Sequence, residues 1–370
     1  MRKLASIRLV GTVEPVQGAD RLEQVSIDGW RVVTRKGDFI PGDKVVYFEI
    51  DSALPADDDR YKFLHERCLK RWMNHGALIK EVVRIKSIKL RGVISQGLIM
   101  SLQEFPELAD KEVGYDATEL LGVQHYDELA EYCGRIQGKA HLAGDQAGSF
   151  PTYLVPKTDE ERLQNLPEYF DGRYNDVMWE VTEKFDGCSA TYIWAPVERP
   201  ENPFFVCSRN FELKDTEGNL YWDIAKKYGI RDKLKRVCDY AKFGYEWART
   251  TQVAIQGEIV GPGVNGNRDQ YTDYAFYVFR AYDITHNRWI HPEACRLFVT
   301  NELGLDYVKV ISGRFDAFGE LRSMDDFLNF VDGDTDRGHP REGMVFKTFV
   351  GDGLVSFKVI NNNYLLKQRD

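Results

Sequence analysis

The sequence predicts a small all-β domain followed by a larger α+β domain. Three observations support this prediction: the length of 370 residues, period-2 strand patterns near the N-terminus, and strands mixed with helices from residue 150 on. Small residues concentrate at residues 144–148. We place the boundary there, which gives domains at residues 1–145 and 146–370.

The first domain is expected to be a small barrel. Turn residues such as Asp28-Gly29 and Pro41-Gly42 separate its short strands, and this pattern favours an oligonucleotide-binding (OB) fold. The insertion at residues 57–80 is expected to be partly helical, and residues 102–138 to be an acidic linker with one or two helices. The candidate strands are residues 5–13, 22–27, 30–34, 44–50 and 82–90.

The second domain alternates strands with helices, as in α+β folds. A capping pattern at Thr158-Asp159-Glu160-Glu161 predicts a helix through Leu166. Further helices are predicted at residues 219–228, 232–249, 292–301 and 323–330. The candidate strands are residues 178–183, 189–195, 204–208, 253–260, 275–284, 343–348 and 354–358.

Composition is that of an ordinary soluble protein, and it excludes several classes. No apolar run approaches the ~18 residues of a membrane span, and the charged N-terminus is unlike a secretory signal. The six cysteines are scattered without a C-x-x-C pair, which predicts neither a zinc site nor a disulfide framework. We therefore expect a reduced, cytoplasmic compartment and no membrane partner. Nothing in the sequence demands an oligomer, and we expect a monomer.

A local basic stripe stands out against the formal net charge of −9. Residues 82–103 contain no acid, and four cations crowd into a strand-like part of this segment. One interpretation is a solvated face on an edge strand. The other, weighted equally, is a surface that contacts the phosphates of a nucleic acid. The four cations are Arg84, Lys86, Lys89 and Arg91.

The segment Lys184-Phe185-Asp186-Gly187 follows a predicted strand and places an amine two residues before a carboxylate. Such a lysine can attack phosphorus once its ammonium is discharged by a metal ion or by neighbouring cations. The glycine would let a bulky ligand approach the backbone. Alone, this four-residue pattern is common enough to arise by chance, so its meaning depends on the rest of the chain.

Four later segments supply charges and a ring. Arg209, in Ser208-Arg209-Asn210, could bind a ribose hydroxyl or a phosphate. Glu258 lies between glycines in an apolar strand, where an edge-strand acid facing water is the simpler interpretation. Phe279 lies on an aromatic strand and would more often be core than a base-stacking ring. Lys347 and Lys358 each end an apolar run, and buried lysines are rare unless paired or bound to an anion.

In this order the segments resemble the nucleotidyltransferase motifs of ATP-dependent polynucleotide ligases and mRNA capping enzymes. KFDG resembles motif I, SRN motif Ia, GEIVGPG motif III, FYVF motif IIIa, REGMVFK motif IV and SFK motif V. The Glu-Gly after Arg341 and the Gly-Pro-Gly after Glu258 resemble RNA ligases more closely than DNA ligases. An OB module in front of a minimal adenylyltransferase domain is similar to the nick-sealing branch of RNA ligases.

The resemblance implies a ligase adenylation domain after the OB barrel, and ATP-dependent joining of 3′-hydroxyl and 5′-phosphate ends of RNA at nicks in a duplex. Lys184 would take AMP from ATP, pass it to a 5′-phosphate, and a 3′-hydroxyl would then expel it. Asp186, Glu258 and Glu342 would hold Mg²⁺ or Mn²⁺ through its waters. The resemblance also implies further nucleotide contacts: Glu183 beside the nucleophile, Lys347 and Lys358 at the α-phosphate, Arg209 at the sugar or an RNA end, and Phe279 on adenine.

Two positions depart from the family pattern. Ile360 stands where relatives often carry a second motif V lysine, a role that Lys358 alone, Lys347 or Lys367 would have to cover. Arg280 follows Phe279 where many relatives have an acid. Three alternatives stay open: a DNA ligase, a GTP-dependent capping enzyme, and a catalytically inactive nucleic-acid-binding protein of the OB type.

Overall fold

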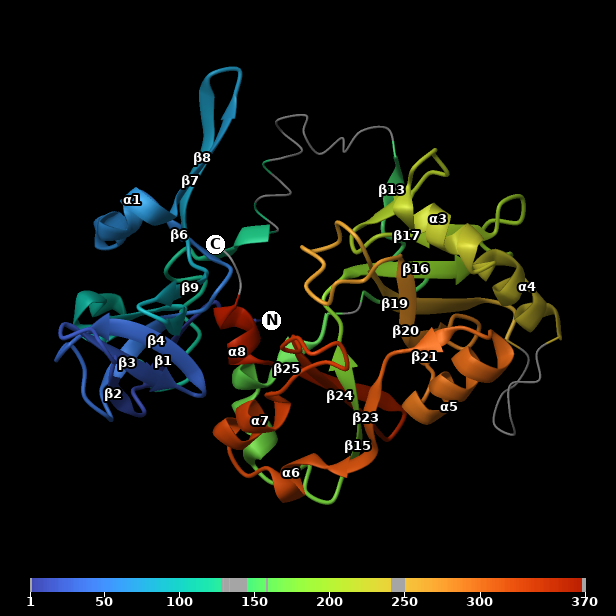
Figure 1. The fold of residues 1–370 in the computed structure, drawn as a ribbon. Helices are drawn as coiled ribbons and strands as arrows, with labels where there is room; N and C mark the ends of the chain where they lie inside the picture. The colour runs from blue at the N-terminus through green and yellow to red at the C-terminus, as the bar shows by residue number, and fades with distance from the viewer. Residues whose placement is uncertain are drawn as a thin grey trace. The chain divides into compact units, whose positions relative to one another are not determined.

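The computed structural model describes residues 2–127, 129, 133, 145–157, 159–240 and 250–367. The chain divides into two compact units, Met1–His141 with Leu365–Asp370, and Leu142–Tyr364 (Figure 1). The predicted boundary at residues 144–148 lies partly outside the described residues. Strand β13 (Gln146–Ser149) already belongs to the second unit. Among the described residues, no helix combines the length and the apolarity needed to cross a membrane.

The first unit is built from short antiparallel strands, and its described residues form three apolar clusters. Strand β5 (Lys44–Phe48) lies between β1 (Ala5–Leu9) and β11 (Leu98–Ser101). Its alternate residues enter different clusters, which explains why it reads as a continuous apolar run. The remaining strands are β2 (Val13–Pro15), β3 (Leu22–Ile27), β4 (Trp30–Arg35), β6 (Ser52–Pro55), β9 (Ser87–Leu90), β10 (Val93–Gln96) and β12 (Gln124–His125).

The insertion at residues 57–80 is only partly helical, as predicted, and its second half is a hairpin. A 3₁₀ helix (Asp59–Leu64) and α1 (His65–Cys68) are followed by β7 (Leu69–Asn74) and β8 (Ala77–Arg84). His75 and Gly76 at the turn have φ of 47° and 83°, which is the backbone that a two-residue hairpin loop requires. The predicted strand at 82–90 is therefore divided between β8 and β9.

The predicted linker at residues 102–138 contains two short 3₁₀ helices, Leu102–Glu104 and Pro106–Leu108. Most of it beyond residue 127 lies outside the described residues.

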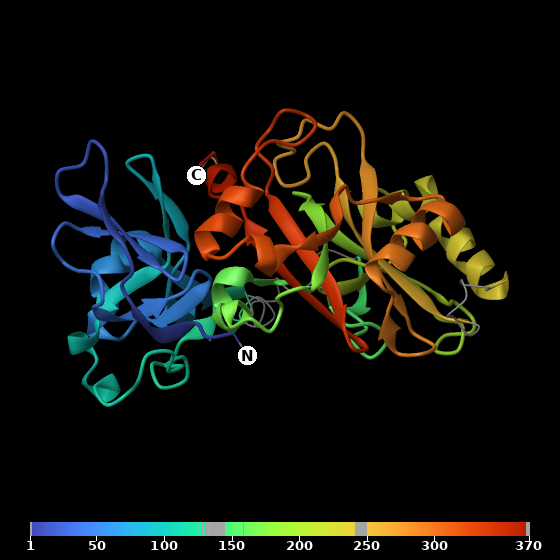
Figure 2. The ribbon, with the colours of Figure 1, turned by 90° about the horizontal axis from the view of Figure 1, so that it is seen from below.

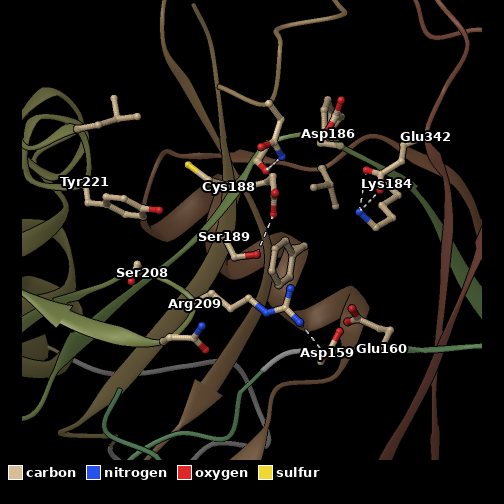
Figure 3. Close-up of a pocket in the computed structure, with 18 of the residues that line it drawn as sticks. Asp159, Glu160, Lys184, Asp186, Cys188, Ser189, Ser208, Arg209, Tyr221 and Glu342 are labelled. Atoms are coloured by element: carbon tan, nitrogen blue, oxygen red, sulfur yellow. Dashed lines mark hydrogen bonds and ion pairs between the residues drawn. The ribbon is translucent and has the colours of Figure 1, made fainter. Parts of the chain in front are cut away.

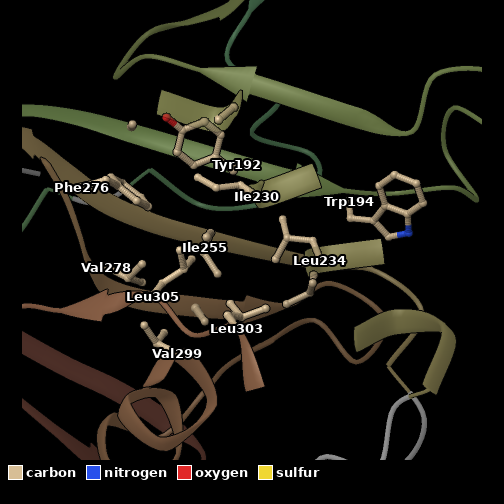
Figure 4. Close-up of a cluster of buried hydrophobic side chains, with 14 of the residues drawn as sticks. Tyr192, Trp194, Ile230, Leu234, Ile255, Phe276, Val278, Val299, Leu303 and Leu305 are labelled. Atoms are coloured by element: carbon tan, nitrogen blue, oxygen red, sulfur yellow. The ribbon is translucent and has the colours of Figure 1, made fainter. Parts of the chain in front are cut away.

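The second unit contains an eight-stranded sheet with helices on one face. Its order is β13-β18-β17-β16-β19-β20-β21, with β22 beside β20. Helices α3 (Leu220–Lys227), α4 (Ile230–Tyr240) and α5 (Pro292–Leu297) share one buried cluster with the sheet (Figure 4). The predicted helix at 232–249 runs past residue 240, outside the described residues. The other strands are β16 (Cys188–Trp194), β17 (Phe204–Cys207), β18 (Phe211–Leu213), β19 (Val253–Val260), β20 (Ala275–Asp283), β21 (Arg288–Trp289) and β22 (Asp306–Tyr307).

A five-stranded sheet, ordered β14-β25-β24-β15-β23, forms the rest of this unit. An aromatic-rich cluster joins it to α6 (Ala317–Glu320) and α7 (Met324–Val331). Figure 2 shows the ribbon of this part of the chain from below. Helix α8 (Asn362–Leu366) follows the last strand. The strands are β14 (Glu161–Arg162), β15 (Met178–Lys184), β23 (Val310–Asp316), β24 (Gly343–Val350) and β25 (Gly353–Ile360).

The helix predicted at residues 158–166 is wrong in the described part of that range. Glu161 and Arg162 form β14, which pairs in parallel with Phe357 and Lys358 of β25, and a 3₁₀ turn follows at Leu163–Asn165. Pairing with a strand almost 200 residues later overrides the local capping signal. Thr158 itself lies outside the described residues.

Strand β15 directs alternate side chains to the two faces of the five-stranded sheet. Trp179 and Val181 enter the aromatic cluster, so Glu180, Thr182 and Lys184 point to the opposite face. Lys184 is paired with Gly343 of β24, and Glu180 with Lys347. This register places Glu180 and Lys184 of β15 and Lys347 of β24 on one face.

Candidate active site

A cavity of about 770 Å³ lies in the second unit and is lined by residues of both its sheets (Figure 3). This volume is in the range of small-molecule and cofactor sites. All residues predicted to bind the nucleotide or the metal line it, although their roles stay predictions. They are Glu183, Lys184, Asp186, Arg209, Glu258, Phe279, Glu342, Lys347 and Lys358.

Lys184 stands at the end of β15 with its ammonium beside the carboxylate of Glu342, and Nζ lies 2.7 Å from that carboxylate. Gly343, which follows Glu342, is required by the close approach of β25, because a Cβ there would lie 2.1 Å from the Val359 carbonyl oxygen. Burial alone would lower the pKa of Lys184, but the charges of Glu342 and Glu258 raise it above its usual value. In the protein without a bound ligand, the Lys184 side chain is therefore an ammonium.

Glu258 lies on β19, an interior strand paired on both sides by β16 and β20, so it is not an edge-strand acid. Ser189, its cross-strand neighbour, donates a hydrogen bond of 3.2 Å to the carboxylate. Burial raises the pKa of Glu258 to about 7, with Lys184 opposing the rise and Glu342 adding to it.

Asp186 and Gly187 close the motif. Asp186 Oδ2 is buried without a hydrogen bond, and Arg268 Nε is its charged neighbour at 3.8 Å. A Cβ at Gly187 would lie 2.3 Å from the Ile259 carbonyl oxygen. The glycine is therefore required by the close approach of β19, where the sequence suggested the approach of a ligand.

The three predicted metal ligands do not form a direct coordination shell. Across the residues that the structure describes, no group of three or more His, Cys, Asp or Glu side chains is arranged to hold a metal ion. Glu342, Glu258 and Asp186 instead face Lys184, Ser189 and Arg268. Coordination through water molecules stays a prediction.

Two of the predicted ligand-binding cations share one carboxylate. Asp159 lies 2.9 Å from Arg209 and 3.4 Å from Lys358, and both Asp159 and Arg209 are more than half exposed. Burial lowers the pKa of Lys358, with Asp159 opposing. Sequence reasoning did not single out Asp159, which lay in a segment interpreted as a helix.

Phe279 and Arg280 lie at a β-bulge in β20. Gln256 of β19 pairs with Arg280 and the next residue, Gly257, pairs with Val278, so Phe279 is the extra residue. The slip turns Phe279 and Arg280 to the same side of the sheet. Arg280 donates to Glu160 at 2.8 Å and to Ser356 at 3.2 Å. The residue that departs from the family pattern thus has a place in the fold.

Three further positions from the sequence analysis are Glu183, Ile360 and Lys367. The carboxylate of Glu183 is buried, 3.8 Å from Lys309 Nζ, and burial raises its pKa. Ile360 is buried opposite Gly343. Lys367 is counted with the first unit, so its suggested role at the phosphate stays a prediction.

The basic stripe of the first unit divides into two parts. The guanidinium of Arg84 lies over the ring of Tyr126 at 4.0 Å and 3.9 Å from Asp51. This contact gives Arg84 a structural role. Lys86, Lys89 and Arg91 are exposed around β9, where both interpretations of the stripe still apply.

Comparison with known proteins identifies similar domains and similar structures. A protein-family model described as an OB-fold domain matches residues 4–102, and one described as RNA ligase matches residues 177–360. A mutant Naegleria gruberi RNA ligase with AMP and Mn is 32% identical, with a TM-score of 0.75 and 99% of each chain covered. A mutant with ATP and Mn is 32% identical (TM-score 0.74), and the structure with PPi is 33% identical (TM-score 0.73), each covering 99% of both chains. A search of curated proteins finds no match.

The fold and the site define a ligase nucleotidyltransferase domain preceded by an OB-fold domain, which confirms the predicted fold class. The chain belongs to the RNA ligase family, and the predicted enzyme class is confirmed with it.

Proposed function

We propose that the protein is an ATP-dependent RNA ligase that seals 3′-hydroxyl and 5′-phosphate ends at nicks in duplex nucleic acid. The observation that carries this proposal is the position of Lys184 Nζ in a nucleotide-sized cavity, 2.7 Å from the Glu342 carboxylate. The charge of a second carboxylate, Glu258, also raises the pKa of this lysine. Family membership and relatives solved with ATP, AMP or PPi support the use of ATP.

In the first step, the Lys184 amine attacks the α-phosphorus of ATP, a P–N bond forms, and the P–O bond to pyrophosphate breaks. In the second, a 5′-phosphate oxygen of RNA attacks the same phosphorus and the P–N bond breaks. In the third, a 3′-hydroxyl attacks the activated 5′-phosphate and AMP leaves. Every step is a displacement at phosphorus, so positioning and charge neutralisation supply most of the catalysis.

The acids fit a hard divalent cation. They are oxygen donors, Asp186 Oδ2 is buried without a hydrogen bond, and burial raises the pKa of Glu258 although the charge of Lys184 opposes the rise. Asp186, Glu258 and Glu342 would hold Mg²⁺ or Mn²⁺ through its waters, and its charge would lower the pKa of Lys184. Glu342 is then the group that gives up its contact with Lys184 when the amine must be neutral.

The other side chains bind and orient the nucleotide. Lys358 would neutralise the α-phosphate and Arg209 would contact the sugar or an RNA end, in each case after release from Asp159. Phe279 would stack on the adenine.

Covalent labelling tests the chemistry. We expect α-labelled ATP with Mg²⁺ or Mn²⁺ to leave label on the denatured protein, and Lys184→Ala to abolish it. Lys235→Ala, an exposed lysine on α4, is the matched control and should label normally. Label on Lys184→Ala would refute the nucleophile. Label from GTP would favour capping, and no label from either nucleotide would favour an inactive binding protein.

Nicked duplexes test the substrate. With ribose or deoxyribose at the 3′-hydroxyl end, we expect preferential sealing of the ribose end, and equal sealing would refute RNA specificity.

All six cysteines are free thiols. This supports keeping the cytoplasmic compartment in the proposal.

A further inference from the structure

Lys347 is the buried lysine whose surroundings fit phosphate binding least. Its side chain is 3% exposed, compared with 26% for Lys184 and 21% for Lys358. We propose that Lys347 is a positioning residue, which fixes the bulge of β20 through the Phe279 carbonyl and thereby orients the ring that stacks on the adenine. This inference rests on the proposed use of the cavity for ATP.

The ammonium of Lys347 already has three oxygen partners. Nζ donates to the Phe279 carbonyl at 2.9 Å and to the Tyr307 hydroxyl at 3.3 Å, and lies 3.4 Å from Glu180 Oε1. An ammonium has three N–H donors, so these contacts occupy its capacity. A phosphate could be contacted only by giving up one of them.

The Phe279 carbonyl is the partner that links Lys347 to the nucleotide. Phe279 is the extra residue of the bulge and has no register partner on β19. On the other side of β20, the pairing with β22 ends at Val278 and Tyr307. A backbone group outside the ladders needs another partner when it is buried. Lys347 supplies that partner, with the Tyr307 hydroxyl also 3.3 Å from the carbonyl oxygen.

We call the Lys347 ammonium together with the Glu180 carboxylate, the Tyr307 hydroxyl and the Phe279 carbonyl the clamp. Its positive and negative charges balance without a ligand. Glu180 is 4% exposed and lies directly across from Lys347 on β15, and it accepts a 2.8 Å hydrogen bond from Tyr307. Moving Lys347 to a phosphate would leave a buried carboxylate unpaired, which is costly. By contrast, Lys358 is paired with the half-exposed Asp159 and can exchange it for a phosphate.

The clamp also joins the two sheets. Lys347 and Glu180 come from the five-stranded sheet, whereas Phe279 and Tyr307 come from the eight-stranded sheet. The same contact that orients the ring therefore fixes it relative to Lys184, which stands four residue pairs along β15 from the Glu180–Lys347 pair, on the same face.

Single-turnover self-adenylylation across a range of ATP concentrations tests the inference in the full-length protein. A positioning role predicts that Lys347→Met raises the half-saturating ATP concentration at least tenfold and changes the maximal rate less than threefold. Phe279→Ala should raise half-saturation similarly. In the Phe279→Ala background, Lys347→Met should add less than twofold, because the ring it orients is gone.

Two further variants separate positioning from misfolding. Glu180→Gln/Lys347→Met removes both buried charges together, and Tyr307→Phe removes only one hydroxyl. Both should keep a cooperative thermal transition and still raise half-saturation. Lys358→Met serves as the phosphate-contact reference, with the maximal rate reduced at least thirtyfold.

The outcomes are distinct. A large loss of maximal rate in Lys347→Met with unchanged half-saturation would overturn the inference, and so would multiplicative effects of Lys347→Met and Phe279→Ala. Unchanged half-saturation in Phe279→Ala would also overturn it, while labelling that depends on Lys184 would leave the proposed ligase chemistry standing. Loss of labelling in the wild type would instead remove the proposed function.

Discussion

Glu258 should make the stability of the nucleotide-free and metal-free protein depend on pH. Its pKa rises from 4.5 to about 7. The folded-state pKa lies above the unfolded one, so the stability it contributes is complete below pH 4.5 and is lost as the pH rises through 7. A difference of about 2.5 pKa units amounts to about 3 kcal/mol at full effect. Water in the cavity screens this group, so we expect the free energy of unfolding to change by about 1–3 kcal/mol.

Glu258→Gln tests this reasoning, because glutamine has a similar shape and no proton to lose. The unfolding free energy of both proteins would be measured in denaturant at pH 5, 6, 7 and 8 without metal. The wild type should lose about 1–3 kcal/mol relative to the variant between pH 5 and pH 8. Added Mg²⁺ or Mn²⁺ should recover part of this at pH 8 in the wild type alone. Parallel curves would refute the account of Glu258.

Three further predictions follow from local geometry. Gly187→Ala should destabilise the protein by about 1–3 kcal/mol in thermal unfolding, because its Cβ would meet the Ile259 carbonyl, whereas Gly148→Ala has open space and should not. Asp159→Asn should lower the half-saturating ATP concentration about two- to fivefold, the worth of an exposed ion pair, and weaker binding would contradict competition between Asp159 and phosphate. Charge reversal of both Lys86 and Lys89 should weaken nick sealing in a salt-dependent way while self-adenylylation is unchanged; equal loss of both would contradict a substrate-binding surface.

Local patterns predicted much of the fold. The strand at residues 253–260 coincides with β19, and the helix at residues 219–228 contains α3 with Asn219 as its cap. Their signals are contained within a few residues, as alternation or as a cap. The helix at 158–166 failed because pairing between β14 and β25 depends on residues almost 200 positions later.

The candidate site was predicted as a set of side chains and not as a set of contacts. Chemistry-bearing residues such as Lys184 and Glu342 can be read from motifs, but their 2.7 Å contact spans 158 residues of chain. The bulge at Phe279 could not be predicted either, because it depends on the register between β19 and β20. The Lys347 ammonium received a phosphate role by resemblance, whereas its neighbours suggest a structural one.

The candidate active-site cavity lies between two sheets, with the proposed nucleophile Lys184 on one sheet and Glu258 and Phe279 on the other. Each sheet is held by its own apolar cluster, one rich in aromatic rings and one covered by helices. A small shift of one cluster against the other would change the distance from amine to phosphorus without altering any residue that touches ATP. Substitutions deep in either core can therefore change the rate of adenylylation. The rate depends on how rigidly the two sheets are held against each other.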